Sequence, residues 1–135
     1  MDIVFELCLR LIVAFVLGGI VGLEREYRSK DAGFRTHFLV ALGSALFTIS
    51  SQYGFADGVK DTSRVAAQVV SGIGFLGAGM IIFQKNMVRG LTTAAGLWVT
   101  AAIGMACGGG LYAVAFFVTA LILCLLYTSD AADDG

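Results

Sequence analysis

Five long apolar runs, separated by short polar segments, make up most of the chain. They cover residues 3–23, 38–53, 65–83, 91–108 and 111–127. A helix needs about 20 predominantly apolar residues to cross a bilayer, and these runs are close to that length. Because the connections are short, consecutive runs must be antiparallel neighbours. The pattern predicts an all-α fold, a polytopic membrane bundle of about five transmembrane helices.

The composition strengthens this interpretation. The 135 residues are 58% hydrophobic and 14% charged, whereas soluble domains are about 45–50% apolar and about 25% charged. No basic face with interleaved aromatic residues is present, which argues against nucleic-acid binding. The three cysteines are far apart and the chain has one histidine, so neither a metal motif nor a thiol nucleophile is indicated. We expect no enzyme activity and no cofactor, with Mg²⁺ left open as a ligand or a signal.

Lys and Arg in the connections predict the orientation in the membrane. The connections at residues 24–35 and 84–90 fall on one side of the bilayer and carry most of the positive charge. The connection at residues 54–63 falls on the other side and contains Lys60. We therefore expect the N-terminus outside, the C-terminus in the cytoplasm, and residues 128–135 as an acidic, disordered or non-native tail.

The third apolar run contains Gly72, Gly74, Gly77 and Gly79. The first three spell GxGxxG, the fingerprint of a dinucleotide-binding loop, which requires an acidic residue about 20 positions later. The next carboxylate in the chain is Asp130. The glycines therefore favour a membrane helix over a nucleotide site.

On a helical wheel, Gly72 and Gly79 lie on one side with Gln68, while Gly74 and Gly77 lie on the opposite side. Glycines let membrane helices approach closely, so we expect this helix at the centre of the bundle, with a break or kink near its middle as an alternative. The Gln68 side is expected to meet a stripe of small residues on the fourth run. That stripe consists of Thr93, Gly96, Thr100, Gly104 and Cys107. Close packing without a ligand and a substrate pathway both remain open for this contact.

Two charges, Glu6 and Arg10, lie inside the first run at a spacing that favours a helical ion pair. They either face a polar interior or reach the headgroups. Glu6 and Asp61 are weak candidates for a metal ligand, since Mg²⁺ prefers several oxygen ligands. The residues expected to mediate helix packing are Gly18, Gly22, Gly72, Gly74, Gly77, Gly79, Gly96 and Gly104.

Four motifs in unbroken order resemble the membrane domain of the MgtC/SapB family. They are GGIVGLEREYR from residue 18, AGFRTH from residue 32, DTSRVAAQVVSGIGFLGAGMI from residue 61 and VRGLTTAAGLWVTAAIGMACGGG from residue 88. The resemblance covers about residues 10–125. Its polar motif positions in this chain are Glu24, Arg25, Glu26, Arg35, Thr36, Asp61, Arg64, Gln68 and Arg89.

The resemblance implies a bacterial inner-membrane protein linked to magnesium limitation and, in pathogens, to virulence inside macrophages. Two functions follow as alternatives. One is a regulator that contacts other membrane proteins, such as the F-type ATP synthase, and we expect it to be a homo-oligomer. The other is a transporter or channel component for Mg²⁺ or another cation. Many members carry a soluble C-terminal domain, so we expect either a short-form member or a cut sequence.

Overall fold

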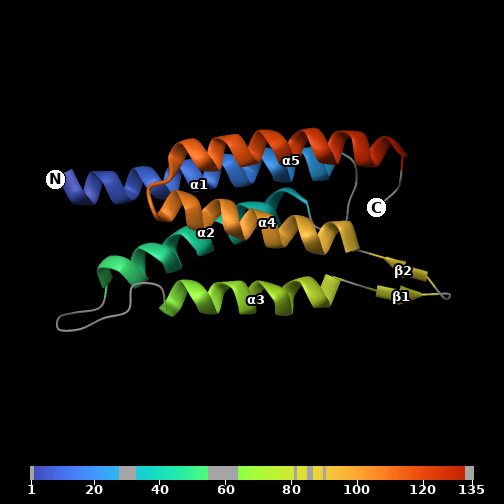
Figure 1. Cartoon of the computed structure of the whole chain (residues 1–135), viewed down its shortest axis with the longest axis horizontal. Coiled ribbons are helices and arrows are strands. Elements are labelled where there is room, and N and C mark those ends of the chain that lie inside the picture. The colour runs from blue at the N-terminus through green and yellow to red at the C-terminus, as the bar shows by residue number, and fades with distance from the viewer. Residues whose placement is uncertain are drawn as a thin grey trace.

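The computed structural model describes residues 2–27, 33–54, 64–80, 82–84, 87–89 and 91–132. Five α-helices form a bundle (Figure 1), which confirms the predicted helical fold. By length and composition, two of the described helices, α1 and α4, could cross a membrane. The helices are α1 (Asp2–Tyr27), α2 (Phe34–Ile49), α3 (Arg64–Met80), α4 (Leu91–Gly108) and α5 (Tyr112–Ala132).

Several helix boundaries differ from the predicted spans, among them the C-terminal ends of α2, α3 and α5. Helix α3 ends at Met80, and the rest of the third apolar run forms strand β1 (Ile82–Gln84), which pairs antiparallel with β2 (Met87–Arg89). Apolarity alone does not separate a short strand from a helix end. Helix α2 is followed by a π-helical segment, Ser50–Gly54. Helix α5 continues to Ala132, so the start of the predicted acidic tail extends the helix.

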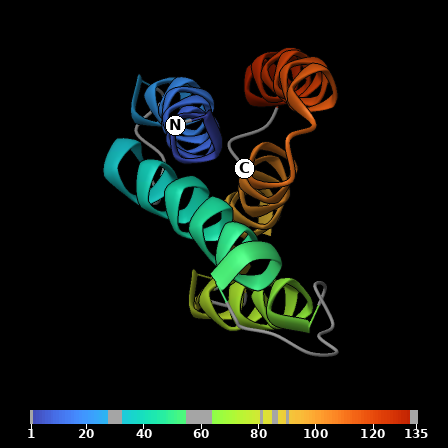
Figure 2. The same cartoon turned by 90° about the vertical axis from the view of Figure 1, so that its left-hand side faces the viewer.

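Helix α4 lies at the centre of the bundle, because it contacts each of the other four helices. Figure 2 shows α2 and α4 between α3 on one side and the pair α1 and α5 on the other. One core cluster joins α1, α4 and α5 through residues such as Leu17, Ile103 and Ala115. The other joins α2, α3 and α4 through Ile73, Leu97 and their neighbours.

Helix α2 is pressed between α1 and α4 at Ala41, which is fully buried. A Cβ added to Gly18 of α1 would meet the Ala41 methyl group, and one added to Gly104 of α4 would meet the Ala41 carbonyl. Gly22 and Gly108 make similar approaches to the α2 backbone at Phe34 and Ala45. These glycines allow backbone-to-backbone contact, in the way that small residues do in membrane helices.

The predicted central position of the third span is wrong. Helix α3 lies at the edge of the bundle (Figure 2) and runs without a break from Arg64 to Met80. A Cβ added to Gly72, Gly74 or Gly79 would meet nothing within 4 Å, and Gly77 makes only an ordinary contact with Ala94. A wheel places residues on faces, but it does not say which face another helix covers.

The predicted match between α3 and the threonine stripe of α4 is also wrong. Helix α3 packs on Leu97 and Ala101 of α4, whereas Gly104 and Cys107 of the stripe face α2 and α1. Gly96 has open space around it. The Thr100 hydroxyl donates to its own helix, to the Gly96 carbonyl at 2.7 Å, so it makes no bond across helices there.

Candidate functional site

Two groups of polar residues lie at opposite ends of the bundle, and each contains some of the predicted residues. Glu6 and Glu24 are both on α1, and 18 helical residues span about 27 Å at 1.5 Å per residue. The C-terminal end of α1 lies at the same end of the molecule as the β hairpin (Figure 1). The two groups therefore cannot form one site, and each is described separately.

The first group, the Arg25–His37 cluster, consists of Glu24, Arg25, Glu26 and His37. It joins the end of α1 to the start of α2. Arg25 and His37 are each 1% exposed, although one is charged and the other is polar. The Arg25 Nη1 atom lies 3.6 Å from Glu24 Oε1, which places a carboxylate beside the buried guanidinium. A buried charge needs such a partner, because desolvation is costly.

His37 is held by its own helix. Its Nδ1 atom lies 2.8 Å from the Gly33 carbonyl, and because a carbonyl only accepts, Nδ1 must donate. The other ring nitrogen, Nε2, is buried and has no hydrogen-bond partner among the residues that the structure describes. Gly22 of α1 lies directly against this residue, since a Cβ there would be 3.0 Å from the His37 Cβ.

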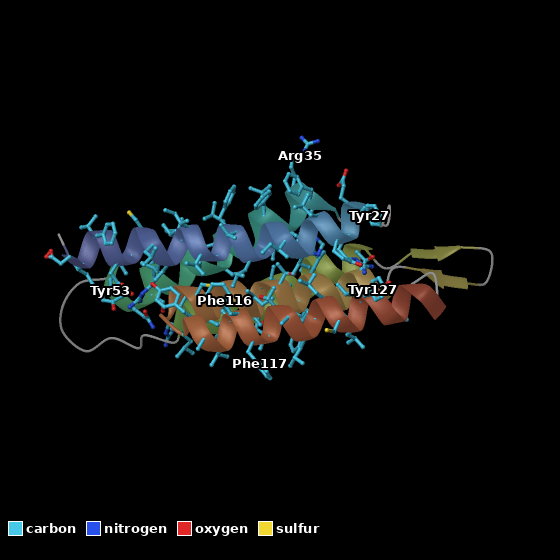
Figure 3. All side chains as sticks on the ribbon, turned by 90° about the horizontal axis from the view of Figure 1, so that it is seen from above. Tyr27, Arg35, Tyr53, Phe116, Phe117 and Tyr127 are labelled. Atoms are coloured by element: carbon cyan, nitrogen blue, oxygen red, sulfur yellow. The ribbon has the colours of Figure 1, made fainter. Side chains whose placement is uncertain are left out.

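Glu26 has a structural task in the same cluster. Its Oε1 atom accepts a hydrogen bond of 3.1 Å from the Phe34 backbone N–H, the first residue of α2. The first N–H groups of a helix lack partners within it, so this carboxylate caps α2 and complements its dipole. Arg35 and Thr36 are exposed on α2, and Arg35 points away from the bundle in Figure 3.

The second group, the Glu6–Arg10 cluster, consists of Glu6, Arg10, Tyr53 and Tyr112. The predicted ion pair is present, with Arg10 Nε 3.0 Å from Glu6 Oε2. The same carboxylate oxygen accepts a 3.0 Å hydrogen bond from the Tyr112 hydroxyl of α5. Arg10 also lies over the Tyr53 ring, 5.7 Å from its centroid. Glu6 and Arg10 thus face the bundle and tie α1 to α5.

Arg10 further satisfies the end of α4. Its Nη1 atom donates to the Gly108 carbonyl at 2.9 Å, one of the terminal carbonyls that a helix leaves unpaired. The chain turns here through Gly110, which has a φ of 85°. A Cβ at Gly110 would lie 3.2 Å from the Arg10 guanidinium. The absence of a side chain at Gly110 therefore leaves room for the Arg10 guanidinium.

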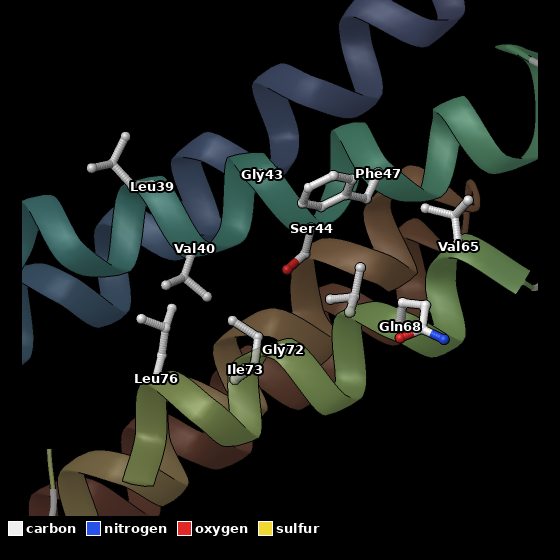
Figure 4. A pocket seen from close by; sticks show the side chains of 11 residues that line it. Leu39, Val40, Gly43, Ser44, Phe47, Val65, Gln68, Gly72, Ile73 and Leu76 are labelled. Carbon is white, nitrogen blue, oxygen red and sulfur yellow. The ribbon is translucent and has the colours of Figure 1, made fainter. Parts of the chain in front are cut away.

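The remaining predicted residues lie apart from both clusters. Arg64 and Gln68 are exposed on α3. Arg89 ends β2, and Asp61 lies outside the described residues. Gln68 lines an apolar groove of about 410 Å³ between α2 and α3. Figure 4 shows Gln68 and Ser44 as the polar side chains of its lining, among residues such as Val40 and Ile73.

Similarity to known proteins shows which family the chain belongs to. A model of the MgtC family matches residues 11–134. The chain belongs to the MgtC family. This confirms the resemblance drawn from the four sequence motifs, and it supports a membrane protein.

Curated relatives of this MgtC-family chain are similar over most of its length. The putative magnesium transporter YhiD of Escherichia coli K12 is 50% identical over 127 residues, which cover 90% of this chain and 59% of that protein. Protein MgtC of Salmonella typhimurium LT2 is 48% identical over 122 residues, covering 90% and 52%. Protein MgtC of Brucella abortus is 51% identical over 110 residues, covering 82% and 45%.

This MgtC-family chain therefore spans less than two thirds of the length of these curated relatives. No solved structure matches it.

The described part of this MgtC-family chain offers few side chains that could bind a metal ion. Among those residues, no three His, Cys, Asp or Glu side chains lie together. Glu6, a weak candidate, already accepts hydrogen bonds from Arg10 and Tyr112. A dehydrated Mg²⁺ site would need more oxygen ligands than this cluster offers.

Sequence reasoning missed three participants. They are His37, Tyr53 and Tyr112. The signal for Tyr112 was available, because Arg10 inside an apolar run needs partners and the glycine triplet before Tyr112 marks a tight turn. No sequence signal pairs His37 with α1, since that contact depends on how α2 crosses α1.

Proposed function

We propose that this chain is a multi-pass inner-membrane protein that acts in magnesium homeostasis by contacting other membrane proteins. The observation that carries the proposal is that polar side chains inside the bundle are engaged with one another. Glu6, the carboxylate furthest inside a predicted span, is engaged by Arg10 and Tyr112. A cation pathway needs side chains that can exchange ligands with the ion, whereas these groups hold helices together.

Surfaces for helix contact support the same proposal. Helix α3 is covered on one side by α4, and its Gly72, Gly74 and Gly79 face open space. The groove between α2 and α3 is apolar and offers one amide, Gln68, and one hydroxyl, Ser44. In a bilayer, small residues and isolated polar side chains favour association with another helix. Partners of this kind are a second copy of the chain or a subunit of the F-type ATP synthase.

Transport of Mg²⁺ is the second candidate function. It is favoured by the name of the Escherichia coli relative, a putative magnesium transporter that is 50% identical to this chain. Asp61 and Gln68 are the residues that such a pathway would use first. A hydrated ion that touches one carboxylate would need no dedicated ligand cage.

The proposed orientation places the N-terminus outside and the C-terminus in the cytoplasm. Its support is the excess of Lys and Arg in the connections at residues 24–35 and 84–90. The C-terminal end of α1 and the β hairpin lie at the same end of the bundle (Figure 1), as this orientation requires. Attachment of a reporter enzyme after residue 27 or after residue 54 tests it, and activity in the cytoplasm is expected only after residue 27.

Two measurements on the same protein separate the two functions. The first is Mg²⁺ uptake into liposomes that contain the purified chain, compared with empty liposomes. The regulator predicts no difference, whereas the transporter predicts uptake that is lost in Asp61→Ala or Gln68→Leu.

The second measurement is photo-crosslinking in the membrane. A photoreactive residue at Gly72 probes the open side of α3, and one at Phe117, which is 65% exposed on α5, serves as the control. The regulator predicts a defined adduct at Gly72, to a second copy or an ATP synthase subunit, and none at Phe117. Uptake above empty liposomes without such an adduct would overturn the proposal.

A further inference from the structure

His37 lies in the close contact between α1 and α2. A Cβ at Gly18 would be 2.9 Å from the His37 carbonyl oxygen, and one at Gly22 would be 3.0 Å from its Cβ. At these two glycines the α1–α2 seam is therefore a close contact with the backbone and Cβ atoms of α2. Close-packed contacts deform little. A change in the size or charge of His37 is therefore expected to move one helix relative to the other.

In the neutral form of the imidazole, one ring nitrogen donates and the other accepts. Nδ1 carries the hydrogen that bonds the Gly33 carbonyl, so Nε2 of the neutral ring has a lone pair. That atom is buried and has no partner within the described part of the chain. A proton added at Nε2 would create a donor and a positive charge at a buried position, 1% exposed, on an atom that has no hydrogen-bond partner among those residues.

Charged groups at the end of α1 act on the added proton in opposite directions. Arg25, which is buried, disfavours it electrostatically, whereas the Glu24 carboxylate beside Arg25 favours it, since an opposite charge stabilises the imidazolium. The described part of α4 has Cys107 as its ionisable side chain, at the opposite end of that helix. On α2 itself, Arg35 is exposed and adds a further positive charge.

His37 precedes the second predicted span, and burial lowers the pKa of its imidazole; the Gly33 hydrogen bond opposes this and Arg25 adds to it. A histidine with a lowered pKa in the folded state stabilises the fold fully above its ordinary value, about 6.5. That contribution is lost as the pH falls below this value toward the lowered pKa.

We propose that His37 is a proton-operated latch on the α1–α2 seam, which is closed at neutral pH and loosens in acid. Protonation places an imidazolium beside the Arg25 guanidinium, and the two cations separate the start of α2 from the end of α1. The proposal goes beyond the proposed function, since it holds for a regulator and for a transporter alike. It predicts that this end of the bundle responds to acid while the Glu6–Arg10 end does not.

The first test is the titration of His37 itself. It is the one histidine of the chain, so its imidazole NMR signals in lipid nanodiscs are assigned without ambiguity. We expect a midpoint below about 6.5, the ordinary value. In Arg25→Gln the midpoint should rise, because a neighbouring positive charge is removed. A wild-type midpoint at or above the ordinary value would overturn the proposal.

The second test is the distance across the seam. Spin labels at Leu23 of α1 and Leu39 of α2, which are 55% and 68% exposed, are placed in a chain with Cys8, Cys107 and Cys124 replaced by alanine. We expect a longer or broader distance at about pH 5 than at about pH 7.5, a range that spans the ordinary histidine pKa.

His37→Gln is the matched control for this distance. Glutamine can still donate a hydrogen bond to the Gly33 carbonyl but cannot take up a proton in this range. Its labelled distance should be the same at both pH values. An unchanged distance in the wild-type chain, or an equal increase in His37→Gln, would contradict the latch. If His37→Gln does not fold, Arg25→Gln serves as the control. It removes the positive charge beside the imidazole, so the increase in distance between about pH 7.5 and about pH 5 should be smaller than in the wild-type chain.

Discussion

Glycines on α1 and α4 lie against the backbone of α2, whereas most glycines on α3 face open space. Gly18 and Gly104 approach Ala41 from two sides, and Ala41 is fully buried between them. Gly72, Gly74 and Gly79 have no atom within 4 Å of an added Cβ. Helix α3 is richer in glycine than α2, yet α2 has helices on both sides and α3 lies at the edge of the bundle.

The difference separates two uses of glycine. At Gly18 and Gly22 of α1, and at Gly104 and Gly108 of α4, the space of the missing side chain is filled by the backbone of α2, so these glycines are needed for the packing of this chain. In α3 the missing side chain leaves an open surface, which offers close approach to something outside the chain. Glycine content alone does not distinguish these uses, because it says nothing of what faces each residue.

The largest expected effect comes from Gly104→Leu. Its new side chain would meet the Ala41 carbonyl, a backbone atom that cannot move aside without shifting α2. Overpacking a core costs about 1–3 kcal/mol, and more where backbone must move. We expect a loss of about 3 kcal/mol or more in the free energy of unfolding, measured by denaturant titration in detergent micelles.

Gly72→Leu is the matched control, because it makes the same substitution within a helix. Its side chain would enter open space, and replacing glycine removes a helix penalty of about 1 kcal/mol. We expect unchanged or slightly raised stability. Equal losses in the two variants would mean that the comparison between the closed and open glycines is mistaken.

A smaller effect is expected from Arg10→Met, which tests whether polar contacts also hold α1 against α4. The variant leaves the Gly108 carbonyl without its donor and Glu6 without its ion-pair partner. Hydrogen bonds to charged groups contribute about 1.5–3 kcal/mol. We expect a loss of about 2 kcal/mol in the same denaturant titration.

Tyr112→Phe isolates one contact of that cluster. It removes the hydroxyl that donates to Glu6 and keeps the ring, so the expected loss is about 1 kcal/mol. A loss as large as that of Arg10→Met would show that the tyrosine, rather than the arginine, secures this end of α1.

The sequence was sufficient to predict where the helices lie along the chain, but not which helices pack against one another. Apolar runs of near-membrane length located all five helices, and the spacing of Glu6 and Arg10 predicted their ion pair. These features are local, since they depend on residues within one helix. The contact between Arg10 and Gly108 joins residues 98 positions apart, and no local pattern encodes it.

The failed predictions share a physical cause. Placing α3 at the centre assumed that each glycine face meets a neighbour, and the same assumption matched Gln68 to the threonine stripe. Helix faces are set by hydrophobic periodicity only where one side meets water. In a chain that is apolar all round, the sequence does not distinguish a lipid-facing side from a helix-facing side.

The smallest expected effect comes from Glu26→Ala, which asks whether the α1–α2 seam is positioned by its glycines or also by the cap of α2. Glu26 accepts a hydrogen bond from the Phe34 N–H, and Gly22 packs on Phe34 and His37 from the same helix. Because loss of a cap costs about 1 kcal/mol and this contact is exposed, we expect a loss of about 0.5–1 kcal/mol. Arg35→Ala, an exposed neighbour that points away from the bundle (Figure 3), should change nothing measurable. If Glu26→Ala costs as much as Gly104→Leu, then α2 is held chiefly by its first turn, and the glycine contacts with α1 follow from that anchoring rather than cause it.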